Sequence, residues 1–202
     1  MTVPGRVDAA ALLLSLDPPP WAIRHARAVG EVAGWLAARI DGRGIPVDRR
    51  LVEAAALLHD VDKLIGPDDP AAALRHGDGS ADWLARRGHP ELARAVANHP
   101  VTRLADGEAF RRWSAFATRE ERIVAYADKR AGPRLEPMAA RFAAWRRRYG
   151  NFASWDPPTQ AEVLRRAARL ETDVCRAAGV VPADVRRLRW TGAAIAAARE
   201  DR

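Results

Sequence analysis

The chain has 202 residues, of which 48% are hydrophobic, so it is long enough to bury one substantial core. Its single cysteine, Cys175, excludes an internal disulfide framework and is compatible with a reducing compartment. The longest apolar run near the start, residues 9–14, is too short for a membrane span and lacks a basic leader. We therefore expect a soluble, cytoplasmic protein without a membrane partner.

The formal net charge is +7, from 33 basic and 26 acidic residues. Such a balance favours anionic partners such as nucleotides, phosphoesters or RNA. However, Lys63 and Lys129 are the only lysines, and the dominance of arginine is typical of a preference across a whole genome. Nucleic acid is therefore not the favoured partner, and charge alone does not define the function.

Apolar periodicity and chain breaks predict an all-α protein. A short helix over 7–16 ends before the prolines at 18–20, because consecutive prolines remove backbone donors and disfavour helix in the residue before them. A long helix follows over 21–40, and Asp48 is the expected N-cap of a helix over 49–63. The remaining segments of this half are expected to be helices over 71–87, 90–98, 119–131 and 137–149, with a loop and short helix over 101–118. The 71–87 helix is expected to be interrupted near Gly77 and Gly79.

The C-terminal part begins with the best linker candidate, residues 150–158. Thr159-Gln160-Ala161-Glu162 then matches the capping-box pattern and predicts a helix from residue 159 to about residue 178. In the last helical stretch Leu188, Trp190 and Ile195 supply apolar surface, which fits either a homodimer interface or packing on the 7–16 helix. We expect residues 1–150 to form the main domain, with a core over about 21–134, and residues 151–202 to be a helical extension packed on it.

A histidine and an aspartate lie at the end of the apolar stretch LVEAAALLHDVDK, residues 51–63. His59 follows Ala55 by four residues, and Asp60 follows Ala56 by four, so both side chains are expected to point inward. Burying either of them without a partner would cost several kcal/mol. A metal ion is the most economical partner for both.

Four further positions share a predicted helix face with apolar residues: His25, His76, His99 and Asp128. A single histidine on an apolar face is more often a hydrogen-bonded core residue than a ligand. Six such histidine and aspartate positions, spread over five predicted helices, are instead typical of a metal centre. Imidazole and carboxylate together suit Zn, Mn, Fe or similar divalent ions better than Ca.

The order of these six positions, together with the stretches Ala55–Lys63 and Tyr126-Ala127-Asp128, makes residues 21–134 resemble the HD superfamily of metal-dependent phosphohydrolases. The resemblance implies an HD-domain helical bundle that binds two divalent ions, drawn from Fe, Mn, Zn, Ni or Co. It implies that one ion is held by His25, His59, Asp60 and Asp128. The second ion would be held by His76 and His99, with Asp60 as the bridge.

For function, the resemblance implies a phosphohydrolase that cleaves a nucleotide or other small phosphorylated compound with metal-activated water. Asp60 and Lys63 are the expected catalytic residues. Each of the two lysines lies within three residues of a proposed ligand, and arginines follow Asp128, the last of these ligands in the sequence. The expected substrate-binding residues are Lys63, Lys129, Arg130 and Arg134.

Two alternatives stay open. The spacing of Asp128 and Arg134 resembles the branch that hydrolyses diadenosine tetraphosphate, so a dinucleoside polyphosphate or a cyclic nucleotide is an alternative substrate. The second alternative is that the chain is a regulatory HD module with a structural metal, which binds a nucleotide or RNA through the basic stretch 141–148. Asp62 departs from the family pattern, in which many members have glycine, and either faces solvent or acts beside a ligand.

Overall fold

The structure is a computed structural model that describes residues 3–132, 134–149 and 155–201. Within these ranges the chain forms ten α-helices joined by short 3₁₀ helices and contains no β-strand, apart from one isolated bridge between Ala131 and Leu135. The all-α prediction is confirmed. None of the helices in the described part of the chain is long and apolar enough to cross a membrane.

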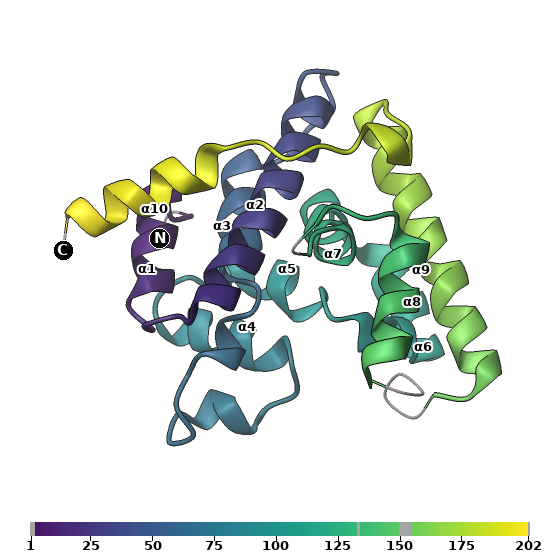
Figure 1. The fold of residues 1–202 in the computed structure, drawn as a ribbon, viewed down its shortest axis with the longest axis horizontal. Coiled ribbons are helices and arrows are strands. Elements are labelled where there is room, and N and C mark those ends of the chain that lie inside the picture. The colour runs from purple at the N-terminus through teal and green to yellow at the C-terminus, as the bar shows by residue number, and fades with distance from the viewer. Residues whose placement is uncertain (1–2, 133, 150–154, 202) are drawn as a thin grey trace.

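Three mutually packed helices form the centre of the molecule (Figure 1): α2 (Pro20–Asp41), α3 (Arg49–Leu58) and α7 (Arg119–Arg130). Pro20 is well suited to begin α2, because the first helical position needs no backbone N–H donor. Asp48 caps α3 as predicted, and its carboxylate accepts a bond of 2.9 Å from the Leu51 N–H. Thr118 and Glu121 form a capping box that begins α7.

The segment between α3 and α7 is divided into more and shorter helices than the periodicity predicted. Its helical pieces are η1 (Val61–Lys63), η2 (Pro70–Ala73), α4 (Asp78–Arg86), η3 (Pro90–Leu92), α5 (Ala93–Ala97), η4 (Val101–Leu104) and α6 (Gly107–Phe116). The predicted helix over 49–63 ends at Leu58, because Asp60 leaves helical geometry with φ −107° and ψ 19°. The interruption predicted near Gly77 and Gly79 in the segment 71–87 is confirmed at Gly77, whose φ of +88° strongly favours glycine.

On the other side of α7 lie α8 (Met138–Tyr149) and α9 (Pro157–Ala178). The prediction that α9 begins at Thr159 is wrong by two residues. Asp156 is the N-cap and accepts a bond of 2.8 Å from the Thr159 N–H, while prolines occupy the first helical positions. Part of the predicted linker, residues 150–154, lies outside the described residues, and its end belongs to α9.

After α9 the chain forms η5 (Pro182–Asp184) and then crosses α2 to reach α10 (Trp190–Glu200), so that the first and last helices lie side by side (Figure 1). The last helix packs on α1 (Arg6–Leu14). Their small apolar cluster consists of Ala10, Leu14, Ala194, Ile195 and Ala198. Packing on the N-terminal helix therefore accounts for Ile195, and a homodimer stays a prediction.

Candidate metal centre

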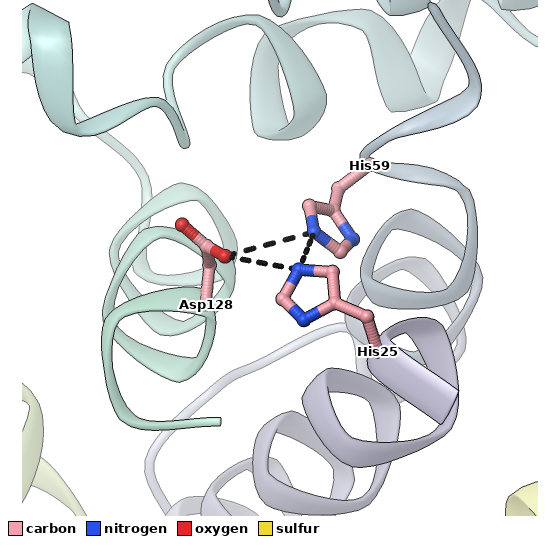
Figure 2. A group of neighbouring side chains, drawn as sticks. All are labelled: His25, His59 and Asp128. Carbon is pink, nitrogen blue, oxygen red and sulfur yellow. Dashed lines mark hydrogen bonds and ion pairs between the residues drawn. The ribbon is translucent and has the colours of Figure 1, made fainter. Parts of the chain in front are cut away.

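Three side chains from α2, the end of α3 and α7 point toward one another (Figure 2). His25 Nε2 lies 3.1 Å from His59 Nε2 and 3.3 Å from Asp128 Oδ1, and His59 Nε2 lies 3.8 Å from the same carboxylate oxygen. Asp60 joins this group, with Oδ2 at 3.4 Å from His25 Nε2 and 3.6 Å from His59 Nε2. These four residues are the predicted ligands of the first ion.

The other oxygen of Asp60 faces a second group of ligand atoms. Its Oδ1 lies 3.3 Å from His99 Nε2 and 3.5 Å from His76 Nε2, and the two imidazole nitrogens are 3.2 Å apart. One carboxylate thus lies between two sets of imidazoles. All six side chains predicted as ligands therefore converge on one place.

The hydrogen bonds of the imidazole rings leave the inward nitrogens free to coordinate. Nδ1 of His59 donates to the Ala56 carbonyl at 2.8 Å, and Nδ1 of His99 donates to the Val96 carbonyl at 2.5 Å. When the outer nitrogen carries the proton, Nε2 presents a lone pair to the centre.

A cation resolves the electrostatic problem that these lone pairs create. Unprotonated Nε2 atoms 3.1 Å and 3.2 Å apart repel each other, and a positive ion between them turns the repulsion into coordination. Asp60 Oδ1 is also buried and has no hydrogen-bond partner among the described residues, which is costly unless a cation balances it. The residues present therefore fit divalent metal ions with nitrogen and oxygen ligands.

The charge states at neutral pH agree with this fit. Burial lowers the pKa of His59 to about 3, so that its ring is neutral and able to coordinate. Although burial opposes ionisation, neighbouring His59 and His99 hold the pKa of Asp60 well below its usual value. The pKa of Asp128 is likewise lowered despite burial, because the neighbouring His25 ring favours the charged carboxylate. Neutral imidazoles and ionised carboxylates are the forms that bind metals.

A pocket of about 290 Å³ opens onto the ligands. Lys63 lines it, and its Nζ donates to Asp60 Oδ2 at 2.8 Å. The remaining lining includes Trp21, Thr102, Arg141 and Trp145. The periodicity of α2 could have identified Trp21, which precedes His25 by four residues and so shares its face.

The prediction needs correction for three of the substrate-binding residues, because none of the three is part of the pocket lining in the described part of the chain. Lys129 is fully buried and donates to the carbonyls of His99 at 2.7 Å and Ala125 at 3.0 Å. Arg130 is also buried and pairs with Glu171 at 3.1 Å. Successive helical residues are about 100° apart, so the positions after Asp128 point away from the pocket.

The third correction concerns Arg134, which is exposed in the turn that follows α7. Its carbonyl accepts a bond of 3.1 Å from the Gly132 N–H. The prediction placed this arginine beyond the predicted helix over 119–131, among the basic residues that follow Asp128. That helix ends at Arg130, so Arg134 does not share its direction.

Asp62 is buried beside a ligand and does not face solvent, which settles the two roles that the sequence left open. Its side chain is 7% exposed, and Oδ2 accepts a bond of 2.9 Å from Nδ1 of His76. The same oxygen accepts a bond of 2.7 Å from the Gly77 N–H. Burial opposes its ionisation, yet the bond from His76 lowers the pKa of Asp62 below its usual value.

Comparison with known protein families agrees with the fold and the site. The model of the HD domain family matches residues 22–132, which is more than half of the chain. The chain therefore belongs to the HD domain family, a superfamily of metal-dependent phosphohydrolases. No significant match is found among curated proteins or solved structures.

Proposed function

We propose that this protein is a phosphohydrolase that uses two divalent ions to cleave a phosphoester of a nucleotide or another small phosphorylated compound. The observation that supports this most directly is the convergence of four histidines and two aspartates on one open pocket. His25, His59, Asp60 and Asp128 would hold one ion, and His76, His99 and Asp60 the other. Such ions, when bound, activate water for attack on phosphorus and stabilise the charge that develops on the phosphoryl oxygens.

Lys63 is the side chain best placed to bind the phosphoryl group. Its ammonium lies in the pocket and pairs with Asp60, so it is held at the point where the substrate would meet the ions. Burial opposes its protonation, but Asp60 raises the pKa of Lys63 above its usual value. The ammonium therefore stays charged at neutral pH and would neutralise a phosphate oxygen.

The rim of the pocket supports a substrate with a planar group. Trp21 is 48% exposed although it is a large apolar residue, and it lies one helical turn before His25. An indole on a pocket rim offers a flat apolar face on which a nucleobase can stack. The guanidinium of Arg141, which lies over the Trp145 ring at 4.8 Å, provides a second positive group for phosphate.

Replacing the shared ligands tests this function. His59→Ala and Asp60→Ala should each release bound metal and lower kcat/KM by more than the roughly 100-fold typical of losing a residue that supports a ligand. Elemental analysis would measure the metal, and phosphate release from mononucleotides, dinucleoside polyphosphates and cyclic nucleotides would measure the activity.

His89→Ala is the matched control, since His89 is the fifth histidine and lies outside the ligand groups, near Glu91. It should keep both metal and activity. Wild-type metal content and wild-type hydrolysis in both the His59 and Asp60 variants would refute the proposal.

A further inference from the structure

We infer that Asp62 is a positioning residue that holds His76 for the second metal ion and thereby sets how tightly that ion binds. The inference rests on the proposed function, because it concerns the second ion of the same site. Among the described residues, no hydrogen bond or ion pair joins the Asp62 side chain to His25, His59 or Asp128, whose ligand atoms contact one another. Its effect is therefore expected at one ion only.

His76 differs from the buried residues His59 and His99 in how its ring is held. His59 and His99 each donate from Nδ1 to a carbonyl three residues earlier, which their own helical turn supplies. His76 instead precedes α4, at a point where Gly77 has φ +88° and the chain changes direction. The carboxylate of Asp62, fourteen residues away in sequence, provides the acceptor for its Nδ1.

The bond from Asp62 fixes both the tautomer and the direction of the ring. With the proton on Nδ1, His76 Nε2 is a lone pair aimed at Asp60 Oδ1, 3.5 Å away, and at His99. A carboxylate also makes the imidazole a more basic ligand than a carbonyl does. The turn itself is tied to the same group, because Oδ2 accepts the Gly77 N–H.

The backbone around Asp62 is built for close approach to α4. The Asp62 N–H donates to Ser80 Oγ at 3.1 Å, so both its main chain and its side chain bind the start of that helix. A Cβ atom on Gly79 would lie 3.0 Å from Asp62 Cβ and 2.6 Å from the Ala71 carbonyl oxygen. Glycine at 79 therefore lets the two segments meet, and the contact that orients His76 is specified by the fold.

Titration of the chelator-stripped full-length protein with Co²⁺, followed by visible absorption, tests the inference. Wild type should bind two equivalents. Asp62→Ala and Asp62→Asn should bind one equivalent with wild-type affinity and the other about 10- to 100-fold more weakly. His76→Ala should affect the same equivalent, and adding Asp62→Ala to it should cause little further loss, because the two residues act as one unit.

Asp78→Ala is the matched control, because Asp78 lies in the same turn and pairs with Arg75 and Arg103. It should bind both equivalents normally. Asp62→Asn keeps the size of the side chain but replaces the carboxylate, which makes His76 a more basic ligand, with a neutral amide. It therefore reports on the site even where Asp62→Ala does not fold.

Two results would overturn the inference. One is unchanged binding of both equivalents in Asp62→Asn, and the other is fully additive losses in the Asp62 and His76 double variant. Failure of the proposed function has a different signature, since a wild-type protein that binds no Co²⁺ would contradict that proposal before any Asp62 variant is compared.

Discussion

At the scale of single residues, the direction of each ring and carboxylate depends on where its neighbours accept or donate protons. His59 is directed by a carbonyl of its own helix, and His76 is directed by a carboxylate from another segment. Asp60 is shared, with Oδ2 toward His25 and Oδ1 toward His99. The same six residues with other hydrogen bonds would not present their lone pairs to one point.

Lys63 gives the clearest prediction for a residue proposed to bind the substrate without being a metal ligand. Lys63→Ala should lower kcat/KM about 10- to 100-fold, because one hydrogen bond to a charged group contributes about 1.5–3 kcal/mol. Metal content should stay at the wild-type value, since the ammonium pairs with Asp60 but is not itself a ligand. Steady-state kinetics and elemental analysis on the same preparation measure both quantities, and loss of metal from the variant would make Lys63 structural.

The sequence predicted the ligands better than it predicted the substrate contacts, for a physical reason. Apolar neighbours four residues away, such as Ala55 for His59 and Val124 for Asp128, report which face of a helix is buried. Proximity in sequence reports nothing about direction. Lys129 and Arg130 are next to Asp128 in the chain, yet they are directed into the interior.

At the scale of elements, the early end of α3 is what places the Asp60 carboxylate between the two sets of imidazoles. If α3 continued as a regular helix to residue 63, the Asp60 side chain would be rotated about 100° from that of His59 around the helix axis. The chain instead leaves helical geometry at Asp60 and forms η1, which brings Asp62 against α4. Periodicity predicted where helix α3 begins, through its cap Asp48, but it could not predict this turn, which depends on contacts with distant segments.

An ion pair between the buried Arg130 and the half-buried Glu171 joins α7 to α9. Arg130 donates to Glu171 at 3.1 Å and to the Tyr126 hydroxyl at 2.5 Å, and Tyr126 in turn donates to Glu171 at 2.7 Å. Glu171→Ala should lower the free energy of unfolding by about 2–3 kcal/mol, because it leaves a buried guanidinium without its carboxylate. Chemical denaturation would measure the change.

An exposed pair in the same protein provides the control for this prediction. Glu108 and Arg112 are both more than 70% exposed, and Glu108→Ala should cost no more than about 1 kcal/mol. Equal losses in the two variants would contradict the assignment of Glu171 as the carboxylate that stabilises Arg130.

At the scale of the whole molecule, the two chain ends hold the helices that carry the ligands. Arg6 of α1 donates to both oxygens of Glu53 on α3, at 2.6 Å and 2.7 Å. Thr191 of α10 donates to Glu31 on α2 at 2.7 Å. The sequence could not reveal this arrangement, because an apolar last helix fits a second copy of the chain as well as it fits α1.

The central claim is that segments spread over residues 25–128 converge to bind divalent ions. Elemental analysis of the full-length protein purified without chelator tests it most directly. We predict about two divalent ions per chain, and we predict that their removal by a chelator lowers both the melting temperature and phosphoester hydrolysis, because the ions bind the folded state. A protein that contains no divalent ion, and whose stability and hydrolysis are unchanged by chelator, would contradict the claim.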